Sequence, residues 1–321
     1  MAEIATVSKT DDGTRLMRWF LRMYPSMPQR EFYKLCRGGQ IRLNSKRVTG
    51  REILCAGDAI RIPPTIAGFA TQMHKSEAGD KFSLADLEML RKCIIHNDED
   101  IVVFNKPAGL AVQGGTGIRK SIDKMASALF PYDKIALVHR LDKETSGVLV
   151  VAKNQRATQA LASAFQNKEA FKEYLALLNG DVKPDRGVID NFMIKGQVFE
   201  EPVRANNGTG QRPQRAVTHY QVLSRAGNIS WVLFSPKTGR THQLRLHSAM
   251  SLKAPIVGDT LYGRDVPMDD MLRSMLATNN LFLFAHKITF QHPRTRKMMT
   301  ITAQVPEFMM PVIKFLELKM P

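Results

Sequence analysis

The sequence carries the segment Val138-His139-Arg140-Leu141-Asp142-Lys143-Glu144-Thr145-Ser146-Gly147 between two short apolar runs, residues 135–138 and 148–152. Both runs are rich in β-branched and aliphatic side chains, which favour buried strands. Two rigid strands would therefore hold a polar loop, and catalytic side chains are concentrated on such loops. The alternative is an ordinary connection, in which the Asp, Thr, Ser and Gly of the segment only form a turn.

The order of residues in this segment resembles the signature of one enzyme family. His-Arg-Leu-Asp, two further residues and then Thr-Ser-Gly is the pattern of the RluA-type pseudouridine synthases. The flanking segments are most similar to the RluC group, which modifies large-subunit ribosomal RNA. The resemblance places the catalytic aspartate at Asp142. It also implies an α+β fold, with a mixed, mostly antiparallel central sheet, flanking helices and a cleft across the middle of the sheet.

Three further segments match motifs of the same family, in the family's order. Residues 105–109, Asn-Lys-Pro-Ala-Gly, match a Lys-Pro-x-Gly turn that shapes the floor of the site. Residues 172–174 match a Lys-x-Tyr motif that places an active-site tyrosine at Tyr174, although a tyrosine in an apolar run is more often a core residue. Residues 235–247, Ser-Pro-Lys-Thr-Gly-Arg-Thr-His-Gln-Leu-Arg-Leu-His, match the third motif, and Gly258-Asp259 belongs to the same pattern.

The resemblance implies a reaction carried out by side chains alone, without metal or cofactor. Converting uridine to pseudouridine breaks an N-glycosidic bond, rotates the uracil and rejoins it through C5. The reaction needs a carboxylate acting as nucleophile or as base, and both roles remain open for Asp142. In the family, the last arginine of the third motif, here Arg245, favours the ionised carboxylate. Tyr174 would stack on the uracil and help to remove the C5 proton.

Other motif residues are implied to contact RNA. A uridine leaves its helix for chemistry at a cost on the order of a few kcal/mol. Arg140 matches a family arginine that occupies the vacated place, for which a flat cation is suited. The residues expected to bind substrate or to orient the loop are Lys106, His139, Thr145 and Arg240.

Charge and composition point to a polyanionic partner. The 321 residues include 46 Lys and Arg against 30 Asp and Glu, a formal net charge of +16, and such a balance favours RNA. No apolar run approaches the roughly 18 residues of a membrane-spanning helix, and the first residues resemble neither a secretory signal nor a transit peptide. Three scattered cysteines lack metal spacing. We therefore predict a cytoplasmic monomer that binds RNA, without membrane contact or nucleotide cofactor.

Half of this net charge lies in residues 13–62, where eleven Lys and Arg face three acidic residues. Apolar spacing predicts two short helices separated by prolines, and Gly38-Gly39 ends the second. A hairpin with a turn at residues 44–46 follows. This arrangement resembles the S4 RNA-binding module, although a merely solvated basic face is the alternative. The residues expected to contact phosphates are Arg37, Arg42, Lys46 and Arg47.

The chain is accordingly predicted to divide into four segments. These are a flexible tail (1–12), an S4-like module of two helices and a hairpin (13–64), a linker (65–90) and a pseudouridine synthase domain (91–321). Within the last, residues 180–215 are rich in Gly, Pro, Asn and Arg and predict long hairpins or an RNA-facing loop.

Two other kinds of site are excluded by spacing. Residues 114–121 are Gly-rich, but Arg119 stands where a phosphate-binding loop needs Gly before Lys. His242 and His247 would be separated by about 140° on a helix and would point to opposite faces of a strand. No Cys or carboxylate lies beside them in the sequence, so no metal site is expected.

The sequence leaves three alternatives to modification of ribosomal RNA to compare. The same chemistry could act on transfer RNA, because the catalytic motifs are shared. A non-catalytic RNA-binding or ribosome-assembly factor would lack Asp142, Tyr174 or Arg245, and all three are present. A hydrolase could use His139 and Asp142 with Ser146, but no Gly-x-Ser-x-Gly elbow frames that serine. The target uridines, the use of free RNA or of a precursor particle, and the oligomeric state remain open.

Overall fold

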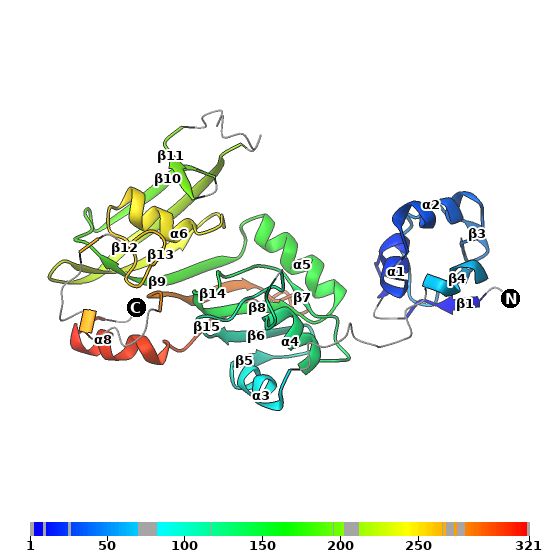
Figure 1. Cartoon of the computed structure of the whole chain (residues 1–321), viewed down its shortest axis with the longest axis horizontal. Helices are drawn as coiled ribbons and strands as arrows, with labels where there is room; N and C mark the ends of the chain where they lie inside the picture. The colour runs from blue at the N-terminus through cyan, green and yellow to red at the C-terminus, as the bar shows by residue number, and fades with distance from the viewer. Residues whose placement is uncertain are drawn as a thin grey trace.

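The computed structural model describes residues 3–8, 11–24, 27–69, 82–115, 117–194, 196–201, 212–264, 266–267, 273–274 and 280–319. A small N-terminal module with its own sheet lies at one end of the long axis, and a large sheet with flanking helices forms the rest (Figure 1). The predicted α+β class with a mixed, mostly antiparallel sheet is confirmed. No described helix is long and apolar enough to cross a bilayer.

The N-terminal module packs two helices on a four-stranded sheet of order β1-β4-β2-β3. Its elements are β1 (Glu3–Thr6), α1 (Leu16–Met23), α2 (Gln29–Arg37), β2 (Arg42–Leu43), β3 (Lys46–Arg47) and β4 (Ala59–Ile62). Apolar residues at helical spacing place Leu16, Phe20 and Phe32 in a shared core, each without exposed surface. Gly39 follows α2 with φ +65°, a left-handed conformation in which glycine avoids the cost that a Cβ would bring.

The predicted flexible tail is wrong where the structure describes it. Residues 3–6 form β1, which pairs antiparallel with β4. Val7 is 2% exposed in the module core, and its N–H donates to the carbonyl of Asp58 at 2.8 Å. The segment thus pairs backbone groups at the β4 edge that would otherwise lack partners. Sequence pattern missed this strand because four residues on a sheet edge carry little periodicity.

The predicted linker is ordered at both ends. Residues Pro64–Phe69 form a 3-10 helix, and α3 spans Leu84–Lys92. The Ser83 hydroxyl accepts a hydrogen bond from the Asp86 N–H, and the Asp86 carboxylate accepts one from the Ser83 N–H, at 3.1 and 3.2 Å. This capping box fixes where α3 begins. The middle of the linker, residues 70–81, and the loop at 206–210 lie outside the described residues.

The large sheet has eleven strands in the order β11-β10-β12-β13-β9-β14-β8-β6-β5, with β15 on β14 and β7 on β8. Its strands are β5 (Ile94–Asn97), β6 (Ile101–Lys106), β7 (Ala136–Leu137), β8 (Ser146–Ala152), β9 (Phe171–Asn179), β10 (Arg186–Ile194), β11 (Gln197–Phe199), β12 (Gln214–Ala226), β13 (Ile229–Pro236), β14 (Leu283–Gln291) and β15 (Met298–Thr302). The β8–β14 pair is parallel, whereas the other pairs are antiparallel. All seven residues of β8 are buried, as its apolar run predicts.

The other helices are α4 (Ile122–Leu129), α5 (Gln155–Gln166), α6 (Gln243–Leu246), a π-helical turn (His247–Ser251), a 3-10 helix (Glu307–Met309) and α8 (Met310–Phe315). Asn154 caps the N-terminus of α5, because its Oδ1 accepts a hydrogen bond from the Ala157 N–H at 2.8 Å. Leu161 from α5 and Val312 from α8 then join the core of the large sheet.

The backbone at Gly147 shows why the Thr-Ser-Gly motif ends in glycine. Its φ is +110°, and a Cβ at this position would lie 2.2 Å from the carbonyl oxygen of Ala285. The parallel pairing of β8 with β14 therefore requires glycine here.

Candidate active site

Three motifs meet at one level of the large sheet. Gly147 of β8 pairs with Ala285 of β14, Ala285 pairs with Tyr174 of β9, and Tyr174 pairs with Phe234 of β13. The loop before β8 carries Asp142, and the segment after β13 carries the third motif. Strand order, rather than sequence proximity, therefore brings these motifs together.

A cavity of about 620 Å³ lies at this level and contains both Asp142 and Tyr174. Its lining includes five cationic side chains against the single carboxylate of Asp142; the five are Arg140, Lys168, Lys172, Lys237 and Arg240. Lys237 lies over the Phe171 ring at 5.4 Å, and Arg240 donates to the carbonyl of Arg215 at 3.2 Å. Within the described part of the chain, none of the five forms an ion pair with a carboxylate. The cavity is therefore positively charged and suited to an anionic ligand.

Burial raises the pKa of the Asp142 carboxyl, and the nearby Glu144 charge adds to this effect. His242, Arg245 and Arg140 act in the opposite direction but do not outweigh burial. Arg245 thus favours the ionised carboxylate, as expected, yet the net shift in the free protein is upward. A desolvated carboxylate lacks stabilising water, which makes it the more reactive form once it is ionised.

Arg245 is held by the carboxylate of Asp259, which belongs to the Gly258-Asp259 part of the family pattern. Its Nε and Nη2 donate to the two oxygens of Asp259 at 2.8 and 2.7 Å, and both residues are buried. Burial tends to raise the pKa of Asp259, but hydrogen bonds from Arg245 and from the N–H groups of Tyr262 and Leu261 outweigh it and lower the pKa. Glu144 lies 3.8 Å from Nη1 of Arg245. Asp259 therefore fixes the guanidinium in place.

Tyr174 is partly buried and packs against two separate clusters of buried apolar side chains in the large domain. Burial, and then the charge of Asp142, raises the pKa of its phenol. The phenol is therefore protonated across the physiological pH range, so that it presents a neutral aromatic face to the cavity.

Lys106 is completely buried and orients the loops around the cavity. Its ammonium donates to the carbonyls of Pro107, Leu110 and Lys143 at 2.9, 2.8 and 2.9 Å. These bonds tie the Lys-Pro-x-Gly turn to the loop that carries Asp142. Of the two roles expected for Lys106, substrate contact and orientation of the loop, these hydrogen bonds support the second. Burial lowers its pKa to about 7, against the opposing charges of Glu144 and Asp142.

Replacing Lys106 with Met is expected to lower the free energy of unfolding by roughly 3 kcal/mol, because buried carbonyls lose their donor. Between about pH 7 and pH 10 the unfolded lysine stays protonated while the folded lysine does not. The unfolded state then binds more protons than the folded state. The free energy of unfolding of wild type therefore increases relative to that of the variant as the pH rises through this window. Urea titrations at pH 6, 7.5 and 9 measure both effects, and a difference that stays constant across the three would contradict the low pKa.

His139 and Thr145 also belong to the loop rather than to an open surface. The Val150 N–H donates to His139 Nε2 at 2.9 Å, and the imidazole stacks on Phe165 with centroids 4.6 Å apart. Burial, and then the charge of Lys172, lowers the pKa of His139 to about 3, so the ring is neutral. Thr145 is buried, and within the described residues its hydroxyl has no hydrogen-bond partner.

This geometry excludes the hydrolase alternative. His139 Nε2 is already bonded to the backbone, so it does not act as a base toward a serine. Ser146 is 1% exposed, and its hydroxyl donates to the carbonyl of Leu283 at 3.5 Å. The two side chains thus do not form a nucleophile–base pair.

The third motif is tied to the sheet by a buried polar network. Gln243 Oε1 accepts from the Thr238 hydroxyl and the Arg240 N–H at 2.7 and 3.0 Å, and its Nε2 donates to Thr218 at 2.9 Å. His247 lies within hydrogen-bond distance of Thr218 and Asn191, at 2.9 and 3.0 Å. Both nitrogens of His247 are therefore used. His242 Nδ1 lies 2.9 Å from the Tyr262 hydroxyl, and the two histidines do not share a ligand site.

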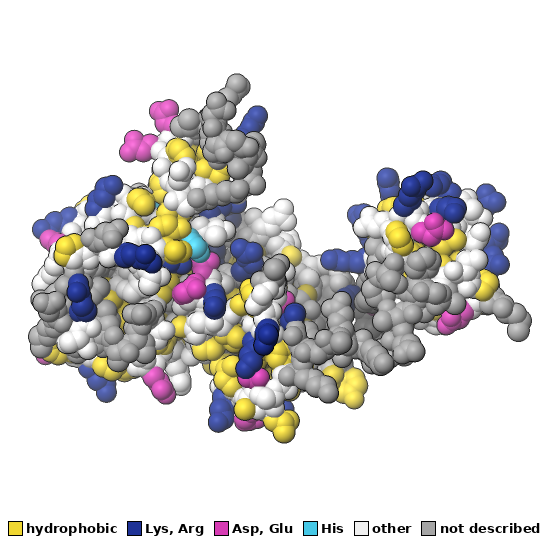
Figure 2. Space-filling view, in the orientation of Figure 1, with side chains coloured by type: hydrophobic (Ala, Val, Ile, Leu, Met, Phe, Trp, Pro, Cys, Tyr) yellow, Lys and Arg dark blue, Asp and Glu magenta, His cyan; other side chains and the backbone are white. Residues whose placement is uncertain are grey.

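The remaining predicted contacts lie on exposed surfaces. Arg140 and Arg240 are exposed beside the cavity. Figure 2 shows Lys and Arg side chains gathered on the N-terminal module. There Arg37, Lys46 and Arg47 are exposed, while Arg42 is half-buried and donates to the carbonyl of Gly39 at 3.2 Å. These four are far from the cavity in the sequence and belong to a separate surface.

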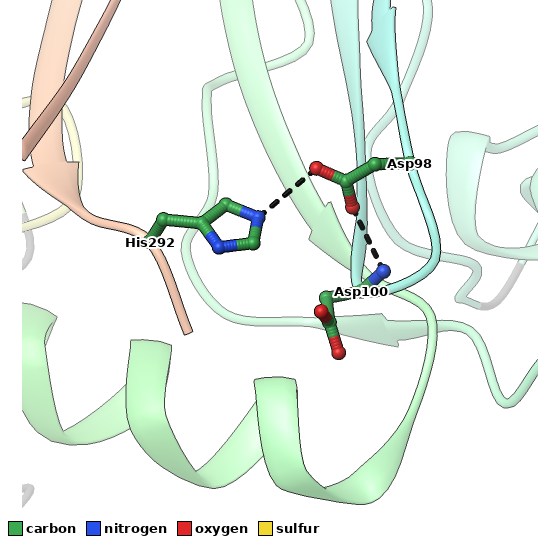
Figure 3. Close-up of side chains that lie close together, drawn as sticks. All are labelled: Asp98, Asp100 and His292. Atoms are coloured by element: carbon green, nitrogen blue, oxygen red, sulfur yellow. Dashed lines mark hydrogen bonds and ion pairs between the residues drawn. The ribbon is translucent and has the colours of Figure 1, made fainter. Parts of the chain in front are cut away.

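One cluster with metal-compatible spacing occurs among the described residues, formed by Asp98, Asp100 and His292 (Figure 3). Its oxygens already have partners. Asp98 Oδ2 lies 2.7 Å from His96 Nε2 and 3.0 Å from His292 Nε2, and Asp98 Oδ1 accepts from the Asp100 N–H at 2.8 Å. Arg294 Nε donates to Asp100 at 2.6 Å. The cluster therefore connects the β5–β6 turn to the segment after β14 and is not a metal centre.

Fold and site together define an RNA-modifying isomerase, and comparisons with known proteins agree. The profile of the RNA pseudouridylate synthase family matches residues 100–250. The chain belongs to this family and is an RNA pseudouridine synthase.

Its relatives include two proteins named ribosomal large subunit pseudouridine synthase C. The one from Vibrio vulnificus is 34% identical over 316 residues, which is 98% of this chain and 96% of the relative. The one from Escherichia coli is 33% identical over 309 residues, 95% of this chain and 93% of the relative. The solved structure of human RNA pseudouridylate synthase domain containing 4 is similar, with a TM-score of 0.63 and 27% identity, covering 73% of this chain and 97% of that chain.

Proposed function

We propose that this enzyme isomerises specific uridines of large-subunit ribosomal RNA. The observation that carries the proposal is the meeting of Asp142, Tyr174 and the Arg245–Asp259 pair beside one positively charged cavity. Full-length similarity to enzymes named for the large ribosomal subunit supports this choice of substrate. The enzyme would act as a cytoplasmic monomer without a nucleotide cofactor.

In the proposed reaction, the target uridine leaves its stack and enters the cavity. Arg140, exposed at the cavity, takes the vacated place in the RNA. The uracil lies against the neutral phenol of Tyr174. Asp142, ionised with the help of Arg245, then acts on the sugar as nucleophile or on the substrate as base. Asp259 keeps the guanidinium oriented throughout, so little reorganisation is needed as charge develops.

Pseudouridine mapping by carbodiimide-stop primer extension tests the proposal. Protein-free large-subunit ribosomal RNA and transfer RNA transcripts are each incubated with the enzyme. We expect new stops in the ribosomal RNA only. Stops confined to transfer RNA would contradict the proposed substrate. If neither transcript gives stops, precursor particles are assayed in the same way, and stops found only there would assign the reaction to an assembly intermediate.

We further propose that the N-terminal module binds RNA phosphates through its exposed cations. Replacing Arg37, Lys46 and Arg47 with Gln should weaken RNA binding and reduce the slope of log Kd against log salt by about 2, since each phosphate contact releases counterions. Fluorescence anisotropy at several salt concentrations measures the slope.

A matched control neutralises three exposed cations near the C-terminus, Arg296, Lys297 and Lys314. This triple variant loses the same formal charge, so any effect of net charge alone appears in both proteins. Equal slopes for the two variants would mean that the N-terminal module does not touch phosphates.

A further inference from the structure

Lys172, a cation of the active-site cavity, has no partner among the residues that the structure describes. It lies in β9, is half-buried and lines the cavity. Other buried or half-buried cations have partners: Lys287 is paired with Glu173 at 2.7 Å and Arg245 with Asp259, and three backbone carbonyls satisfy Lys106. Within the described part of the chain, no hydrogen bond or ion pair reaches the Lys172 ammonium, and burial lowers its pKa. An unpaired buried charge is costly, which points to an anion supplied by the ligand.

Lys172 and Tyr174 lie on the same face of β9. Side chains two residues apart project from the same face of a strand, so the ammonium and the phenol rise from one face of β9. Their Cα atoms are separated by about 7 Å, from the rise of a strand. A nucleotide whose base lies against Tyr174 carries its phosphate beyond the sugar, along the wall on which Lys172 stands.

On its β13 side, β9 has no paired neighbour at Lys172 among the described residues, whereas on the other side Lys172 pairs with Ile288 of β14. Pairing of β13 with β9 runs from Asn179 to Tyr174 and then stops. The third motif crosses the gap instead, and Gly239 is the residue of that segment that faces the ammonium. A Cβ at Gly239 would lie 3.9 Å from Lys172 Nζ. Glycine at this position therefore leaves free the space in front of the charge.

We propose that Lys172 binds the phosphate that adjoins the target uridine. The cavity would then recognise a nucleotide at two points, its base at Tyr174 and its phosphate at Lys172. The inference rests on the proposed function, because it assumes an RNA substrate in this cavity. Phosphate binding restores a counter-charge to the desolvated ammonium, and it positions the glycosidic bond relative to Asp142.

A double-substitution cycle between protein and RNA tests the proposal. RNA stem-loops carrying a target uridine are made with one neutral methylphosphonate on the 5′ side, on the 3′ side or four nucleotides away. Each is assayed with wild type and with Lys172→Met for Kd and for kcat/KM. On the unmodified RNA, Lys172→Met should lose about 10- to 100-fold in kcat/KM, as expected for a hydrogen bond to a charged group. Neutralising one flanking phosphate should cost wild type the same factor and cost Lys172→Met nothing further.

Three controls separate this result from its alternatives. Lys172→Arg should recover part of the loss, because it keeps the charge. Lys237→Met should lower kcat/KM by the same factor whether or not a flanking phosphate is neutralised. The two losses then multiply. The thermal midpoint of Lys172→Met should equal or exceed that of wild type, because an unpaired buried charge has been removed.

Losses that multiply for Lys172→Met at both flanking positions would overturn the proposal. A wild-type enzyme that fails to turn over the unmodified RNA would contradict the proposed function instead. The cycle then still decides the phosphate contact, because Kd is measured without turnover.

Discussion

Replacing Asp142 with Asn is expected to reduce isomerisation by on the order of 10⁴-fold or more. The amide keeps the shape of the side chain but neither forms a covalent bond to the substrate nor accepts its proton. RNA binding should stay close to wild type. Carbodiimide-stop mapping measures the turnover, and anisotropy measures the Kd.

Stability provides a second readout for the same variant. The pKa of Asp142 is raised in the folded protein, so its ionisation costs stability as the pH rises above the unfolded value of about 3.9. Asp142→Asn removes this cost and should therefore be at least as stable as wild type at neutral pH. Glu144→Gln neutralises a carboxylate on the same loop and should keep turnover within about tenfold, since Glu144 is half-exposed at the loop surface. If Asp142→Asn kept more than about 1% of the wild-type turnover, Asp142 would not have its proposed role.

Replacing Asp259 with Asn is expected to lower the free energy of unfolding by about 3–5 kcal/mol, because it leaves the buried Arg245 charge without its counter-charge. Turnover should fall by at least about 100-fold, since the guanidinium is no longer held by two charged hydrogen bonds. The lowered pKa of Asp259 means that its contribution is present above about pH 4 and is lost as the pH falls. Urea denaturation at pH 7 and at pH 3 measures the stability on the two sides of this change.

The chain offers a matched control for this pair. Arg215 binds Asp190 with the same two-bond geometry, at 2.8 and 2.5 Å, but on an exposed surface. Asp190→Asn should leave both stability and turnover close to wild type, because exposed ion pairs contribute little. If the two substitutions had equal effects, burial would not be what gives the Arg245–Asp259 pair its importance.

The strands around the active site could be predicted from the sequence because apolar runs and motif spacing mark them directly. The apolar runs before and after Asp142 form β7 and β8. The sequence pattern does not predict strand β1, because its four residues form a strand only by pairing with β4 and have no periodicity of their own.

Side-chain environments were harder to predict than positions. The motif match implies that Lys106 contacts substrate or orients the loop, but it does not predict the three carbonyls that satisfy its ammonium in the interior. Asp259 stands fourteen residues after Arg245, and no local periodicity predicts that the two meet. The net pKa of Asp142 depends on how burial and several charges combine, which a motif does not encode.

The position of β14 has a consequence for the order in which the enzyme becomes active during synthesis. β14 spans residues 283–291 and is inserted between β8, which follows the Asp142 loop, and β9, which carries Tyr174. Until that strand has left the ribosome, the two halves of the site have no shared hydrogen-bonded neighbour to hold them together. Catalytic competence therefore comes late in translation, so that a nascent chain should fold much of its sheet well before it is able to modify RNA.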